Sequence, residues 1–150
     1  MDNINASDVG YEDGSAAYEG FSVEQQTQFD GTRAKVASVK IEPRPIKFDD
    51  EGKPLAPGVK LEGPAMIVRT VPIAKNSAGV ELCAEEAFYL KKSKITGKWI
   101  VSKNEKSNSY KFLKKYNINR IEEIAMAGRD VILSKKVRQN GTTYLGISFG

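Results

Sequence analysis

The closing segment of the chain carries the pattern that most constrains its fold. Val131–Arg138 and Thr142–Phe149 both alternate apolar and polar residues, and Gln139-Asn140-Gly141 joins them. Asn-Gly accepts the positive φ values of a tight turn, so two such runs around it predict an antiparallel β-hairpin. The alternation directs one set of side chains to the core, namely Leu145, Ile147 and Phe149. The set expected to face away from the core is Tyr144, Gly146 and Ser148.

Three further strands are expected before this hairpin. These segments are rich in β-branched residues or alternate apolar and polar residues with the period of a strand. They are residues 34–42, 59–73 and 80–90. Residues 98–101 continue the third strand or pair with it as a hairpin. Turn-forming residues separate the strands at 48–54 and at 76–79.

A helical segment lies between the third and fourth strands. In residues 107–116 the apolar positions change to the helical period, and Ser107 or Ser109 is suited to cap the first turn. Asn119 then has capping-box spacing to Glu122, which predicts a short second helix that ends at Gly128.

This order predicts a mainly β fold with one helical segment, specifically a five-stranded OB-like Greek-key barrel with the order β-β-β-α-β-β. Other small β-rich folds with one inserted helix share the order. A chain of 150 residues fits one globular domain. We expect residues 33–150 to form the basic barrel domain and residues 1–32 to form an acidic, flexible arm.

The charge of the chain is divided unevenly. Residues 1–30 contain seven acidic residues and no lysine or arginine, whereas the remaining residues contain 12 acidic and 23 basic residues, a net charge of +11 against −7. One-sided charge with weak hydrophobicity is typical of a disordered segment. A basic body favours polyanionic partners and also attracts its own acidic arm, although both charges could simply keep the chain soluble.

The sequence lacks the residues that many catalytic mechanisms require. The chain has no histidine and one cysteine, Cys83, which excludes zinc enzymes, His-dependent hydrolases and Cys–His nucleophiles in their usual forms. Glu81 and Glu85 flank Cys83 and are expected to raise its pKa, which favours a structural thiol. Residues 49–53 contain a Glu-x-Lys triplet of the kind found in metal-dependent nucleases, but Gly52 makes this segment a solvated turn. We therefore expect no catalysis, no metal and no cofactor.

The positive signal combines lysines with aromatic rings. Residues 91–115 contain nine lysines and one acidic residue, Glu105, and a second basic group lies on the final hairpin. Single-stranded nucleic acid needs cations along its phosphates and aromatic faces on which unpaired bases stack, worth about 1–3 kcal/mol per base. The candidate nucleic-acid-binding residues are Tyr89, Lys91, Lys92, Lys98, Trp99, Lys135, Lys136, Arg138 and Tyr144.

Each of these residues also has a purely structural interpretation. Trp99 is followed by Ile100 and Val101 and is equally suited to a core. The lysines at 111–115 fit the wet face of an amphipathic helix, and lysines on edge strands prevent edge-to-edge aggregation. Tyr89 and Tyr144 keep the strongest functional interpretation, because the alternation places both opposite the core face.

Residues 35–150 resemble the OB-fold single-stranded DNA-binding proteins of phages and of archaeal viruses or their hosts. The resemblance lies in the element order, the mixture of lysine and aromatic residues, and the closing hairpin Arg138-Gln139-Asn140-Gly141-Thr142-Thr143-Tyr144-Leu145-Gly146-Ile147. It implies binding of exposed single strands during replication, recombination or repair, without catalysis. Such proteins often carry an acidic tail at the carboxyl end, whereas the acidic segment here is at the amino end.

Two functions follow as expectations. The first is a non-enzymatic protein that binds single-stranded nucleic acid, most simply DNA, with an acidic arm for autoinhibition or for docking a replication partner. The second is an assembly protein, such as a virion or filament subunit, whose acidic arm docks on a neighbouring subunit. Neither a secretory signal nor an apolar run of membrane-spanning length is evident in the sequence, so we expect an intracellular protein of the cytoplasm or nucleoid, or of the host cell if viral.

Overall fold

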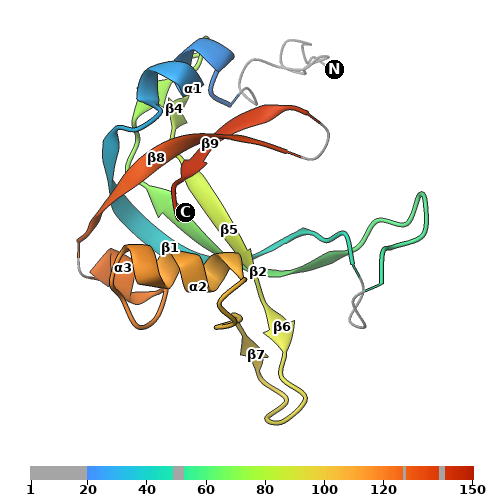
Figure 1. Cartoon of the computed structure of the whole chain (residues 1–150). Coiled ribbons are helices and arrows are strands. Elements are labelled where there is room, and N and C mark those ends of the chain that lie inside the picture. The colour runs from blue at the N-terminus through green and yellow to red at the C-terminus, as the bar shows by residue number, and fades with distance from the viewer. Residues whose placement is uncertain (1–19, 49–52, 127, 139–140) are drawn as a thin grey trace, which may run out of the picture. The chain divides into compact units, whose positions relative to one another are not determined.

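The computed structural model describes residues 20–48, 53–126, 128–138 and 141–150 (Figure 1). The chain forms two compact units, each assembled from separate stretches of sequence. The first unit contains the described residues up to Val36, together with Arg69–Glu85 and Asp130–Ser148. The second contains Ala37–Val68, Glu86–Arg129 and Phe149–Gly150.

The described strands make a mainly β structure. The largest sheet has five antiparallel strands in the order β5-β2-β1-β8-β9. Its strands are β1 (Arg33–Pro45), β2 (Glu62–Thr70), β5 (Glu85–Tyr89), β8 (Asp130–Val137) and β9 (Thr143–Ile147). The sheet is open, with β5 and β9 as its edges, so the mainly β prediction is confirmed and the closed barrel stays a prediction.

Two short hairpins accompany this sheet. One pairs β3 (Ala74–Lys75) with β4 (Glu81–Leu82) across the expected turn, where the Asn76 side chain accepts the backbone N–H groups of Ala78 and Val80. The other pairs β6 (Lys91–Lys92) with β7 (Trp99–Ile100). Residues 99–100 thus belong to a hairpin, but their partner is the short strand that follows residues 80–90 and not that predicted strand itself.

The first unit is built on the predicted closing hairpin. β8 and β9 pair in a register that runs from Leu133 opposite Ile147 to Val137 opposite Thr143. Leu133 and Leu145 form a core cluster with Ala84, and the partly buried residues packed against that cluster are Phe21, Phe29, Ala34 and Ile73.

Two details of the first unit differ from the sequence prediction. Gly146 was expected to face away from the core, but it is buried, directly opposite Ser134 in the hairpin. Residues 80–90 were expected to form one strand, but it is interrupted between β4 and β5. At that point Ala84 exchanges hydrogen bonds with Thr70, whose hydroxyl accepts the Ala84 N–H at 3.0 Å.

Helix α1 (Val23–Phe29) falls within the segment assigned to the acidic arm. Ser22 and Gln25 form a reciprocal capping box, with N···O distances of 3.1 and 2.9 Å, which satisfies two backbone N–H groups at the helix start. The rings of Phe21 and Phe29 lie edge to face with centroids 6.4 Å apart, and α1 contacts β8 and β9. Residues 20–32 therefore contain folded structure, whereas residues 1–19 of the predicted arm lie outside the described residues.

The second unit is centred on an aromatic cluster. Phe112 is fully buried, and its ring lies 4.8 Å from that of Phe88 and 5.0 Å from that of Tyr116. Phe112 and Tyr116 belong to or cap α2 (Asn108–Lys115), which starts at the predicted N-cap, since the Ser107 hydroxyl accepts the N–H of Tyr110 at 3.2 Å.

The second predicted helix begins later than its capping-box spacing suggested. α3 spans Glu123–Met126, and the Glu123 carboxylate accepts the backbone N–H of Arg120 at 2.8 Å. Including α1, the described residues contain three helices, and two of them, α2 and α3, lie in the predicted helical segment. None of the helices in this part of the chain is long and apolar enough to cross a membrane.

Candidate nucleic-acid interface

The β6–β7 hairpin in the second unit presents lysines and rings together. In its antiparallel register Lys92 lies directly opposite Trp99, and Lys91 lies opposite Ile100. Trp99 is 51% exposed, so the alternative that it fills a core is wrong. Lys91, Lys92 and Lys98 are all exposed. A cation and an exposed indole on one hairpin face are the two groups that a phosphate and its base require.

Tyr89 ends β5 in the same unit. Its ring is 53% exposed, while Phe88 beside it is buried, as the alternation predicted. The Tyr89 hydroxyl donates a hydrogen bond of 3.1 Å to the backbone oxygen of Pro45. This bond holds one end of the ring and leaves the side chain half-exposed, which limits the rotamer entropy lost when a base stacks on it.

The first unit holds a second group, at the turn end of the β8–β9 hairpin. Tyr144 lies directly opposite Lys136 in the register. The Arg138 guanidinium lies 4.5 Å from the centroid of the Tyr144 ring, which is cation–π distance. Arg138 also donates from Nη1 to the hydroxyl of Thr142 at 3.4 Å and to the carbonyl of Thr143 at 3.3 Å. The guanidinium and the ring therefore form a preorganised stack at the surface.

Lys135 does not belong to that stack. It lies opposite Leu145, and directly paired residues of an antiparallel ladder share a face, so Lys135 is on the face that carries the core residues. Its ammonium donates to the Thr27 hydroxyl at 2.9 Å, and its backbone N–H donates to the Asp30 carboxylate at 2.9 Å. The lysine thus ties α1 to β8 and is a poor candidate for phosphate contact.

The nine candidate residues therefore divide between the two units. Five lie in the second unit: Tyr89, Lys91, Lys92, Lys98 and Trp99. Four lie in the first: Lys135, Lys136, Arg138 and Tyr144. Within the first unit, three of the four share the outer face of the hairpin.

The lysines of α2, which the sequence interpretation assigned to the solvent-exposed face of a helix, form a further basic surface. A shallow hollow in the second unit is lined by Lys111, Lys114, Lys115, Phe149 and Gly150. The three lysines follow the i, i+3, i+4 spacing of one helix face, and the Phe149 ring packs on Phe88 at 5.9 Å. The spacing was visible in the sequence, but Phe149 is 34 to 38 residues away, so only the tertiary fold brings the ring beside the lysines.

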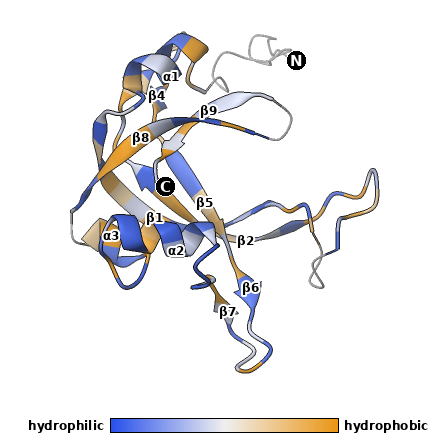
Figure 2. Ribbon diagram, in the orientation of Figure 1, coloured by the Kyte–Doolittle hydropathy of each residue, from blue (hydrophilic) through white to orange (hydrophobic). Residues whose placement is uncertain are grey.

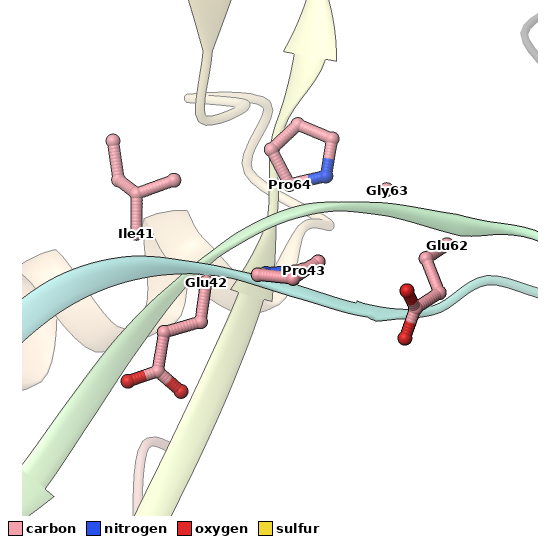
Figure 3. A pocket seen from close by; sticks show the side chains of 6 residues that line it. All are labelled: Ile41, Glu42, Pro43, Glu62, Gly63 and Pro64. Atoms are coloured by element: carbon pink, nitrogen blue, oxygen red, sulfur yellow. The ribbon is translucent and has the colours of Figure 1, made fainter.

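A second hollow in the same unit has the opposite character. It is lined by Ile41, Glu42, Pro43, Glu62, Gly63 and Pro64, where β1 and β2 run side by side (Figure 3). Its polar groups are carboxylates, and Glu42 pairs with Arg44 at 3.1 Å. Carboxylates repel phosphates, so this hollow is not part of the candidate nucleic-acid interface.

Two of the glutamates, one shortly after Cys83 and one just before α3, have cationic partners. Glu85 pairs with Arg69, and Glu122 pairs with Arg120. Burial raises the pKa of the Cys83 thiol, Arg69 lowers it, and Glu85 and Glu81 raise it again. The predicted direction is confirmed, although burial is the main cause. Residues 49–52 of the Glu-x-Lys segment lie outside the described residues, and the described part of the chain contains no group of three potential metal ligands.

Comparison with protein family models, curated proteins and solved structures gives no match to this chain.

Proposed function

We propose that this protein binds single-stranded nucleic acid without catalysing a reaction on it. The observation that carries the proposal is the β6–β7 hairpin, on which an exposed indole stands opposite a lysine in a ten-residue segment that has four lysines and no acidic residue. The Arg138–Tyr144 stack supplies a second pairing of cation and ring, on the first unit. These groups recognise phosphates and unpaired bases, which single-stranded DNA presents.

We further propose that the sheet belongs to an OB-like barrel, and the strand order supports this. The first long strand, β1, lies between the second and the fourth, β2 and β8, and helix α2 follows the third, as in a partly open five-stranded Greek key. OB-folds bind oligonucleotides on the face of their second and third strands and on two loops, one of which joins strands four and five. Tyr89 ends the third long strand, and Arg138 adjoins the loop between the last two.

A second candidate function is self-assembly. It is favoured by a set of large apolar side chains that are exposed on or near the segment joining β1 to β2, namely Ile41, Phe48, Val59 and Leu61. Exposed apolar surface of this kind marks protein–protein contacts. In this case the acidic N-terminal residues would dock on a neighbouring copy.

Replacing Trp99 tests the first proposal directly. Trp99→Ala should weaken binding of a labelled oligothymidylate by about 1–3 kcal/mol, because one stacked base loses its platform. Trp99→Phe, which keeps an aromatic face, should retain most of the affinity. Fluorescence anisotropy at fixed salt measures both variants, and their midpoints of urea unfolding should stay close to that of the parent because the indole is half-exposed. Equal affinity of Trp99→Ala and the parent would remove Trp99 from the interface.

Removing residues 1–19 separates the two roles of the acidic segment. The truncation should stop there because Phe21, Ser22 and Phe29 help to build the first unit. An autoinhibitory segment predicts tighter oligothymidylate binding after truncation, with the largest gain at low salt. Light scattering on the same samples tests the alternative, self-assembly. If residues 1–19 dock on a neighbouring copy, the parent should form a large assembly that dissociates when these residues are absent. Unchanged affinity together with unchanged mass would contradict both roles.

A further inference from the structure

The end of the β6–β7 hairpin exposes apolar side chains in a small region. Ile95, Trp99 and Ile100 are three large apolar residues within six positions, and each is exposed, Ile95 by 94%. Figure 1 shows this hairpin extending away from α2, and Figure 2 colours its tip hydrophobic between hydrophilic residues. Folding of the unit leaves much of this apolar surface exposed to solvent, which points to contact with another molecule.

The tip has a defined shape. The Ser93 hydroxyl accepts the backbone N–H groups of Ile95 and Thr96, each at 3.2 Å. The Ser93 carbonyl accepts the Gly97 N–H at 2.9 Å, and the Ser93 N–H donates to the Lys98 carbonyl at 2.8 Å. Gly97 adopts a φ of 71°, which closes the turn and which a side chain would strain. The backbone around Ile95 is therefore ordered before any ligand arrives, which lowers the entropy cost of inserting the side chain.

Both faces of the hairpin carry the same pair of chemical groups. Paired residues share a face and successive residues alternate, so Lys92 and Trp99 occupy one face, and Lys91 and Ile100 occupy the other. A flat lipid surface would meet the tip and only one of these faces. A ligand that passes on both sides of the hairpin would meet a cation and an apolar group on each.

We propose that the β6–β7 hairpin inserts at the junction between single- and double-stranded nucleic acid and holds the two strands apart. Ile95 packs against the last base pair, Trp99 and Lys92 face one departing strand, and Ile100 and Lys91 face the other. Apolar side chains inserted between base steps unstack them, and the protein surface that the distorted nucleic acid then contacts compensates for the cost. This inference rests on the proposed nucleic-acid binding and adds to it a strand-separating activity.

A forked duplex tests the proposal. It carries two non-complementary single-stranded tails and the fluorescent base 2-aminopurine in the last base pair, and it is titrated with the full chain. The parent protein should raise the 2-aminopurine fluorescence several-fold, as the base loses its stacking partner. Ile95→Ala should lose most of this rise, and Ile95→Asp should lose all of it. The matched control is Met126→Ala, which truncates another highly exposed apolar side chain of the second unit, and it should keep the full rise.

Oligothymidylate anisotropy, measured in parallel, separates the two proposals. Single-strand affinity should be nearly the same for Ile95→Ala and the parent. A full fluorescence rise with Ile95→Ala, or no rise with a parent that binds oligothymidylate, overturns the strand-separating role and leaves single-strand binding intact. Binding to phosphatidylserine vesicles that Ile95→Ala abolishes, with no response at the fork, overturns it in favour of a lipid surface. Failure of the parent to bind either nucleic acid contradicts both proposals.

Discussion

A triple variant in which Lys91, Lys92 and Lys98 become glutamine should lose about 2 units from the slope of log affinity for oligothymidylate against log salt concentration. Each phosphate contact with a single strand releases counterions and contributes about 0.7 to that slope. The three lysines are exposed and lie on or directly beside paired strands, so their removal leaves the hairpin hydrogen bonds in place. Anisotropy titrations from low to physiological salt measure the slope.

The matched control for this variant removes three exposed lysines from elsewhere in the chain, Lys40, Lys60 and Lys75. Both triple variants lower the net charge by the same amount, so long-range attraction weakens equally in both. Only the hairpin variant should lose the contact contribution. Equal slopes for the two variants would mean that the polyanion is attracted by overall charge and does not lie along the β6–β7 hairpin.

Phe112→Ala should have the largest effect on stability, a loss of about 3–5 kcal/mol in the free energy of unfolding. The Phe112 side chain is fully buried, and its ring packs against those of Phe88 and Tyr116, so truncation leaves a cavity that two large rings cannot easily fill. Urea unfolding followed by far-UV circular dichroism measures the change.

Two companion variants make this prediction specific. Phe112→Leu keeps much of the volume and should cost clearly less than alanine. Lys111→Ala changes the exposed neighbour on the same helix and should shift stability by no more than about 0.5 kcal/mol. A Phe112→Ala protein as stable as Lys111→Ala would show that the aromatic cluster is not the core of the second unit.

Some signals present in the sequence were sufficient to locate elements. The Asn-Gly turn and its flanking alternation predicted β8 and β9, and Ser107, the cap of α2, was one of the two caps predicted for that helix. Two others were present but not used. Ser22 and Gln25 have the spacing of a capping box, which predicts α1. Lys135 has the parity of Leu133, which places it on the core face of β8, away from Lys136 and Tyr144.

Other features had no local signal. An indole followed by isoleucine and valine fits a buried strand as well as an exposed hairpin, and Trp99 is exposed because β6 and β7 pair only with each other among the described strands. The break between β4 and β5 depends on hydrogen bonds between Ala84 and Thr70, which are 14 residues apart. Phe149 meets the lysines of α2 through contacts between distant parts of the chain.

The sequence by itself determined the charge of each segment, the strand and helix periods, and the turns and caps, because these depend on residues within a few positions of one another. Only the tertiary structure decided which faces are covered, which lysines are held by neighbours, and which rings stay exposed. Burial depends on the side chains that distant segments bring into contact, and a local pattern of residues does not specify those neighbours.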